Sequence, residues 1–542
     1  MPGIKTRCMF CPMQDAFYVE ELKRTENPVF GRESILNVEF DPDSDRGLCA
    51  RGNFCQELSL HAKRQYRARL NGEYVSLGKT INDLKDSLGN LSGERIAILL
   101  DGSITLEEGM NAIALAKELN TNLVSLAPAE DLAVGGFINT TTFDKIKDAE
   151  TNFVIGDIFT THPTCTKLFH DSRLAARNNT MITLDTVKSR TGWFAHPELV
   201  SPLGKTADLL RDIIGVIGGK DISEVPLQEY GISGDDFGWA ISALKNAAGD
   251  GNVVVGPAWH FADTYEITQL AKELAEVANL GFMVLPISTN SRGIYRLLSS
   301  AGLDITGAYK AITEGKLDAL IGFDCDPVTS LGNIQIPEIF ALTGQVPVDG
   351  LDKATHFIPT TFLFEKKGTI LGTEEDLIKL GGEIKGPGVK STGEIMTIIS
   401  GKKSFDGNMK EIIENFVEPE SSPVAKNALE TGEIMAMGNG NVIHHSDGRY
   451  TRIMPFVNLR GVDEVFEVIL PKGIAEKLSV ENGDKIKISN KNAEVVLPVK
   501  IADWLDGYQI LLPMHQPLAR RLFHWGNSPS ATPIAVKVEK DK

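Results

Sequence analysis

The chain has 542 residues, of which 42% are hydrophobic and 23% charged, and it carries a formal charge of −17 at pH 7. This length exceeds what one hydrophobic core supports, so we expect three or four structural units in a folded, soluble protein. The acidic balance disfavours binding to phosphate backbones and excludes nucleic acid as an expected partner. No apolar run approaches the roughly 20 residues that cross a bilayer, and the N-terminus shows neither a twin-arginine pair nor an apolar signal region, so we expect a cytoplasmic protein without a membrane span.

Four of the six cysteines fall near the start of the chain, among short strand-like pieces and turns, which predicts a small cap over residues 1–64. Beyond it, apolar runs alternate with amphipathic helices, as at 95–100, 106–119 and 122–126. The rhythm returns between 153 and 217 and again between 253 and 323. Alternating strands and helices of this kind predict two α/β units, each built on a parallel sheet.

The C-terminal part differs in pattern, because a polar helix and linker are followed by short strands separated by turns, which predicts a β-barrel. The expected fold class is therefore α/β, with a small N-terminal cap, two parallel-sheet units and a C-terminal β-barrel. The expected boundaries are 1–64 for the cap, 65–150 with 330–402 for a discontinuous first α/β unit, 151–329 for the second, 403–435 for the linker and 436–542 for the barrel.

Cys8 and Cys11 form a Cys-x-x-Cys pair, and Cys49 and Cys55 stand close together farther along the chain. Four thiolates at one site favour either an iron–sulfur cluster or zinc, and spacing alone does not decide between the two. The other cysteines, Cys165 and Cys325, are expected to be buried as small apolar side chains.

The segment Cys8-Met-Phe-Cys11-Pro12, followed by Gly47-Leu-Cys49-Ala-Arg51-Gly52, resembles the motif that opens formate dehydrogenase catalytic subunits and other molybdopterin oxidoreductases, including the large iron–sulfur subunit of respiratory complex I. The resemblance implies a 4Fe–4S cluster. The family places its third cysteine four residues after the second, where this chain has Asp15. The fourth ligand is therefore Asp15 or Cys55, and Arg51 stands where the family has a Lys between cluster and pterin.

Further segments resemble the family in the same order along the chain, and ligands of open parallel sheets bind at the carboxyl ends of strands. The resemblance and this topology together imply that strand ends, helix starts and the barrel face a pterin cofactor. The expected cofactor-binding residues are Arg51, Gly156, Asp157, His162, Asp185, Asn290, Arg292 and His515, with Asp324 as a further strand-end position and His260 as a further cleft residue.

One departure from the family bears on activity. Formate dehydrogenases carry a selenocysteine or cysteine metal ligand, followed by His, in the interval that corresponds to 126–151, and this interval contains no Cys here. The usual formate-oxidising constellation is absent, and the catalytic residues stay unknown. No Gly-x-Gly-x-x-Gly fingerprint accompanies a strand–helix junction, so flavin or NADH chemistry is expected on separate subunits.

Three functions follow from these features. The first is an iron–sulfur electron-transfer subunit of a multi-subunit oxidoreductase, whose partners are other iron–sulfur, flavin or NADH-linked subunits. The second is a molybdenum or tungsten enzyme that holds molybdopterin guanine dinucleotide and acts on formate or a related one-carbon substrate, as formylmethanofuran dehydrogenase does. The third is a non-redox binding protein stapled by zinc.

Overall fold

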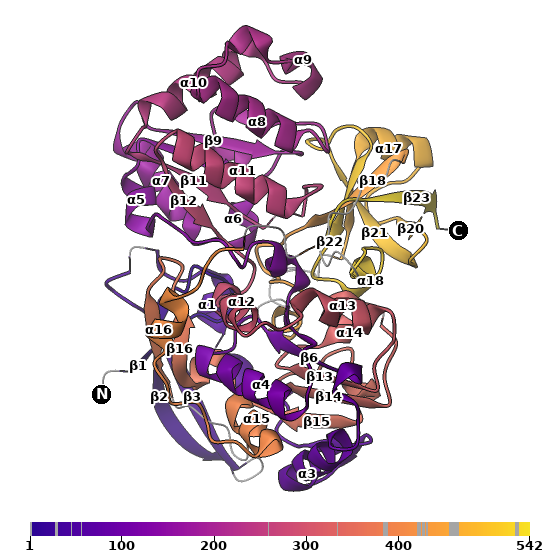
Figure 1. Ribbon diagram of the computed structural model, residues 1–542. Helices are drawn as coiled ribbons and strands as arrows, with labels where there is room; N and C mark the ends of the chain where they lie inside the picture. The colour runs from indigo at the N-terminus through magenta and orange to yellow at the C-terminus, as the bar shows by residue number, and fades with distance from the viewer. Residues whose placement is uncertain are drawn as a thin grey trace.

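The computed structural model of the chain describes residues 3–27, 31–44, 46–55, 57–257, 259–332, 334–382, 389–419, 424, 429, 432–454, 466–525 and 531–541. Residues 420–423, 425–428, 430 and 431 of the expected linker lie outside this part, as does residue 465 before the barrel strands. The expected fold class is confirmed: two α/β units with parallel strands, an N-terminal cap and a closed C-terminal barrel surround a central junction (Figure 1).

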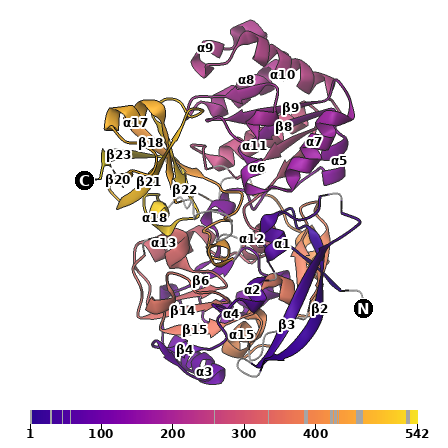
Figure 2. The same cartoon turned by 180° about the vertical axis from the view of Figure 1, so that it is seen from behind.

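The cap is a three-stranded antiparallel sheet in the order β1-β2-β3, followed by two short helices. Its elements are β1 (Ile4–Arg7), β2 (Ala16–Asn27), β3 (Gly31–Phe40), α1 (Ala50–Phe54) and α2 (Glu57–Leu60). The strands β2 and β3 form one long hairpin along the outside of the molecule, whereas α1 lies at the central junction (Figures 1 and 2). The hairpin is longer than the short pieces expected from the sequence, because interstrand backbone hydrogen bonds hold it and composition does not reveal them.

The first α/β unit contains a seven-stranded sheet in the order β5-β4-β15-β14-β13-β6-β7. Its strands are β4 (Arg69–Leu70), β5 (Glu73–Tyr74), β6 (Ile96–Asp101), β7 (Val124–Ala127), β13 (Ala319–Phe323), β14 (Ile339–Gly344) and β15 (His356–Pro359). The helices that pack with this sheet are α3 (Leu77–Leu88), α4 (Leu106–Glu118), α12 (Ser291–Ser300), α13 (Ile305–Thr313) and α15 (Thr392–Ser400). The unit is discontinuous, since the chain leaves it after β7 and returns with α12.

The return point differs from the expected boundary at residue 329. The strand β13 lies within the expected second unit, yet it pairs in parallel with β6, with Leu320 opposite Ala97. The helices α12 and α13 likewise pack against β7. A βαβ rhythm is the same in both units, so the sequence pattern located these elements without indicating which sheet they join.

The second unit is a five-stranded parallel sheet in the order β10-β9-β8-β11-β12. Its strands are β8 (Thr151–Ile155), β9 (Thr180–Asp185), β10 (Glu198–Val200), β11 (Gly251–Val255) and β12 (Gly281–Val284), and its main helices are α5 (Phe143–Asp148), α7 (Cys165–Ala175), α8 (Thr206–Ile217), α10 (Gly234–Asn246) and α11 (Thr264–Val277). Alternate strand residues enter different cores: Val154 packs with α5 and α7, whereas Phe153 and Ile155 pack with α8, α10 and α11. Helices therefore cover both faces, as buried parallel sheets require.

The C-terminal domain is a closed barrel in the order β18-β22-β19-β21-β20-β23. Its elements are β18 (Ile434–Asn439), β19 (Val468–Pro471), β20 (Lys485–Ser489), β21 (Glu494–Ala502), β22 (Gln509–Pro513), β23 (Ile534–Lys540), α17 (Lys472–Leu478) and α18 (Pro517–Arg520). The remaining elements are the hairpin β16 (Lys367–Leu371) and β17 (Leu377–Gly381) and the short helices α6 (Ile158–Thr161), α9 (Leu227–Tyr230), α14 (Pro327–Leu331) and α16 (Met409–Glu414). Across the described part of the chain, no helix has the length and apolar character to span a membrane.

The junction is tightly packed where β6 ends. A Cβ atom on Gly102 would lie 2.4 Å from Oγ of Ser291 and 3.1 Å from the carbonyl oxygen of Ala127. Gly102→Ala is therefore expected to lower the free energy of unfolding by about 1–3 kcal/mol, measured by urea denaturation. The matched control is Gly78→Ala in α3, where a Cβ meets nothing within 4 Å. The control should be neutral or stabilising, because alanine favours a helix more than glycine does.

Candidate cofactor site

The four cap cysteines are brought together by β1, β2 and α1. Cys8 and Cys11 lie in the turn between β1 and β2, while Cys49 and Cys55 are the N-cap and C-cap residues of α1. All four are free thiols, and Cys8, Cys11 and Cys55 are buried, whereas Cys49 is partly exposed.

These thiols lie close enough to influence one another's ionisation. Burial is the main reason why the pKa of Cys8 lies well above its usual value, and Cys55, Cys49 and Cys11 raise it further. Burial also raises the pKa of Cys11 to about 12, with a smaller contribution from Cys49. Over the residues that the structure describes, no three or more His, Cys, Asp or Glu side chains form a group that could hold a metal ion as they stand. The cap therefore gathers thiols without presenting a closed coordination shell.

Asp15 is committed to other contacts, since both oxygens of its carboxylate are used. Oδ1 accepts a hydrogen bond from Nε of Arg46 at 3.0 Å, and Oδ2 accepts one from Oγ1 of Thr164 at 2.7 Å. These bonds fasten the cysteine turn to the start of α7 in the second unit. Asp15 thus acts as a bridge between cap and body.

The Cys8–Cys11 turn is also anchored by the loop after β12. Oγ1 of Thr289 donates to the carbonyl oxygen of Cys11 at 3.0 Å, and Nε2 of Gln14 donates to the carbonyl oxygen of Thr289 at 2.7 Å. Sequence reasoning missed both residues, because single Thr and Gln side chains carry no motif.

Arg51 lies fully buried on α1 between the cysteines and the barrel. One terminal nitrogen donates to the carbonyl oxygen of Thr161 at 2.7 Å, and the other lies 3.0 Å from Nδ1 of His445. The Arg51 guanidinium also lowers the pKa of Cys11, although burial outweighs it. Arg51 therefore connects the cysteine turn to the second unit and to the segment after β18.

His162 follows α6 and is fully buried. Its Nε2 lies 2.8 Å from the carbonyl oxygen of Pro286, and its Nδ1 lies 2.7 Å from Oγ1 of Thr161. Burial lowers the pKa of His162 to about 3, and burial with the nearby Arg51 also holds the pKa of His445 well below its usual value. Both imidazoles are neutral at pH 7.

The depressed pKa of His162 predicts a measurable acid sensitivity. The unfolded chain binds a proton below about pH 6.5, whereas the folded chain does not until about pH 3, so stability is present above pH 6.5 and falls as the pH drops. His162→Gln should remove about 2 kcal/mol of the loss between pH 6.5 and 4.5, measured from urea unfolding curves. Parallel pH profiles for the two proteins would contradict this assignment.

Other histidines line the contact between the barrel and the second unit. Nδ1 of His260 lies 2.9 Å from Oδ1 of Asp185, the last residue of β9. Burial lowers the pKa of His260, but Asp185, Asp157 and the backbone of Gly438 together outweigh burial and raise the pKa above the usual value. The rings of His444 and His515 stack with centroids 4.5 Å apart. Sequence reasoning missed His444 and His445, whose only signal was a His-His pair after a glycine-rich strand end.

The other predicted binding residues are held by internal contacts. Asp157 accepts hydrogen bonds from the backbone and side chain of Thr191, and Gly156 before it has a φ of +86°. Asn290 bonds the backbones of Ile104 and Leu371. Arg292 pairs with Glu375 and also donates to the carbonyl oxygens of Phe137 and Thr373. Arg292 therefore holds the turn between β16 and β17 in place from within the core.

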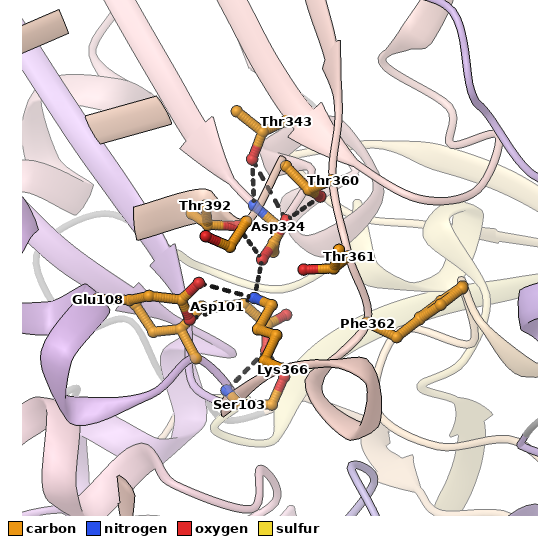
Figure 3. Close-up of polar contacts among 12 residues, drawn as sticks. Asp101, Ser103, Glu108, Asp324, Thr343, Thr360, Thr361, Phe362, Lys366 and Thr392 are labelled. Carbon is orange, nitrogen blue, oxygen red and sulfur yellow. Dashed lines mark hydrogen bonds and ion pairs between the residues drawn. The ribbon is translucent and has the colours of Figure 1, made fainter. Parts of the chain in front are cut away.

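The strand ends of the first unit form a closed polar network (Figure 3). The Lys366 ammonium lies 3.0 Å from Oδ2 of Asp324 and 3.0 Å from Oε1 of Glu108. Asp324 also accepts hydrogen bonds from Thr360, Thr392 and Gln345. Burial lowers the pKa of Lys366, but the two carboxylates outweigh it and raise the pKa above its usual value. The strand-end carboxylate of Asp324 is thus neutralised within the protein.

The interval 126–151, where formate dehydrogenases carry their metal ligand, contains two buried carboxylates, Glu130 and Asp131. Oε1 of Glu130 lies 2.9 Å from a guanidinium nitrogen of Arg520 in the barrel. Asp131 accepts hydrogen bonds from the backbone N–H groups of Ile287 and Ser288, at 2.6 and 2.9 Å. Both carboxylates therefore join this interval to its neighbours.

No protein-family model matches the sequence, and no curated protein matches it. Among solved structures, the chain is similar to acetylene hydratase from Pelobacter acetylenicus, with a TM-score of 0.72 and 10% sequence identity. The likeness covers 99% of this chain and 100% of that chain. At this identity the likeness shows the fold alone, and it extends over the whole chain.

Proposed function

We propose that the chain is an iron–sulfur electron-transfer subunit of a larger oxidoreductase, with a molybdopterin-enzyme-like body. The observation that carries the proposal is the gathering of Cys8, Cys11, Cys49 and Cys55 around α1, where Cys55, Cys49 and Cys11 all raise the pKa of Cys8, and Cys49 raises that of Cys11. Thiolates are the usual ligands of iron–sulfur clusters, and a 4Fe–4S cluster takes four of them. Bound there, the cluster would supply one-electron chemistry.

Cys55 completes the proposed ligand set in place of Asp15. Cys55 is fully buried, and after burial it is the strongest influence on the pKa of Cys8. Asp15 instead has both carboxylate oxygens engaged by Arg46 and Thr164. Moving Asp15 onto iron would break the bridge between cap and body.

The partners in this proposal are iron–sulfur, flavin or NADH-linked redox subunits in the cytoplasm. Electron paramagnetic resonance of the dithionite-reduced, anaerobically purified protein tests it. A signal from a reduced 4Fe–4S cluster supports the proposal. Bound zinc and a silent spectrum would instead indicate the non-redox protein, in which the same four thiolates hold zinc.

A second candidate is a molybdenum or tungsten enzyme that holds molybdopterin guanine dinucleotide and acts on formate or another one-carbon substrate. Two buried polar atoms favour it: Nε2 of His444 and Nε of Arg51 find no hydrogen-bond partner within the described chain. Buried polar groups are normally satisfied, so these atoms fit a polar ligand at the junction of barrel, cap and second unit. Arg51, His444 and His515 would then bind the cofactor as neutral or cationic donors, and the metal would supply redox or Lewis-acid chemistry.

A further inference from the structure

A groove with a volume of about 530 Å³ opens beside Cys49. Four parts of the protein form its walls: the cap around Cys49, the first turns of α7, the loop after β9 at Arg190, and the segment after β18 at Val442 and Ile443. Of the four cap cysteines, Cys49 alone is not fully buried. The groove is therefore the place where the cysteine site comes nearest to the outside.

The charges around this groove are of one sign. Arg46, Lys167 and Arg190 line it together with His170, and no Asp or Glu is among its described lining residues. Arg46 pairs with the buried Asp15 and Lys167 with the partly exposed Asp171, which reduces the positive charge of the groove and leaves Arg190 as its further cation. Such a patch stands out on a chain whose formal charge is −17.

We propose that this groove is the docking surface for the acidic face of a small electron-transfer protein. The inference rests on the proposed function, because the cluster is what makes an electron partner useful at Cys49. With a cluster bound at the cysteines, a reduced partner seated in the groove would lose one electron and the cysteine site would accept it, with no bond formed or broken. Opposite charges steer such partners together, while the remaining acidic surface repels them elsewhere.

The acidic partner is favoured over a small anion for two reasons. The cationic side chains are spread over the cap, α7 and the loop after β9, so they match an extended surface better than a single phosphate. Lys167 and Arg190 are also exposed, as groups at the rim of a transient interface are. A rim of this kind controls the association rate and its salt dependence.

The experiment uses the full chain and a small acidic [2Fe–2S] ferredoxin as the probe. Binding is measured by isothermal titration calorimetry at low and high salt, and ferredoxin-driven reduction is followed by stopped-flow spectroscopy. The test variant is Lys167→Glu with Arg190→Glu, and the matched control is Lys310→Glu, an exposed lysine on α13 outside the groove. The double variant should raise the Kd about tenfold or more at low salt, and the control should change it less than about twofold.

The outcomes separate this inference from the proposed function. Equal affinities of the double variant and the control, or binding by the unaltered protein that is indifferent to salt, would overturn the docking surface. Tight inorganic phosphate binding that excludes the ferredoxin would also overturn it, because the groove would then be an anion site. Reduction by dithionite, followed by paramagnetic resonance, reports the cluster in every variant and does not depend on docking. A protein without iron that still binds ferredoxin through these cations would keep the surface and refute the cluster.

Discussion

Cys55→Ala is expected to reduce the bound iron from about four atoms per chain to below about one, and to abolish the paramagnetic signal of the reduced cluster. The reason is that Cys55 is the buried thiol that acts most strongly on Cys8, so it completes the ligand set that Cys8, Cys11 and Cys49 begin. Iron and acid-labile sulfide are measured in anaerobically purified protein.

Two controls separate ligation from packing. Cys325→Ala also removes a buried thiol, but Cys325 follows β13, outside the cap, and this variant should retain the iron. Asp15→Asn should retain it as well, while weakening the bond to Arg46. Loss of the cluster in Asp15→Asn together with its survival in Cys55→Ala would show that the oxygen ligand is the correct one.

Lys366→Met is expected to lower the free energy of unfolding by about 3–5 kcal/mol, because it leaves Asp324 and Glu108 buried without their cation. The raised pKa of Lys366 means that its contribution is fully present below about pH 10.5 and is lost only above that value. Urea denaturation at pH 7 therefore measures the full effect.

Lys379→Met provides the control, since Lys379 is an exposed residue of β17. Its effect should stay within about 0.5 kcal/mol, as for most surface substitutions. If Lys366→Met behaved like this control, the polar network of Figure 3 would not stabilise the fold. Asp324 would then again be a candidate for binding a ligand.

Regular elements could be predicted from the sequence wherever one periodicity dominated. The expected apolar run at 95–100 and amphipathic helix at 106–119 agree with β6 and α4, because each periodicity is set by neighbouring residues. The helix α12 was not predicted, since its serines, glycine and two arginines suggest a surface loop. Its two arginines are buried because both pair with Glu375, about 80 residues away in the chain, and also donate to backbone carbonyl oxygens.

The residues of the candidate site also divide into those that short local motifs predict and those that depend on distant parts of the chain. Cysteine spacing and family resemblance located the cap thiols and Arg51, because those residues stand in short local motifs. The task of Asp15 depends on Arg46 and on Thr164, which is 149 residues away, so local sequence could not decide it. Likewise, the contact of Arg51 with His445 joins the cap to a segment 394 residues later. Contacts between such distant segments carry no periodic signal.

Metal and pterin analysis of anaerobically purified protein shows most plainly whether the four cap cysteines bind a 4Fe–4S cluster. Iron, sulfide, zinc, molybdenum and tungsten are quantified by mass, and oxidised pterin is measured by its fluorescence. We expect about four iron atoms with matching sulfide in each chain, and Cys55→Ala as the variant that loses them. Molybdenum or tungsten with pterin beside the iron would favour the catalytic enzyme over the electron-transfer subunit. Zinc without iron would contradict a cluster on the cap cysteines.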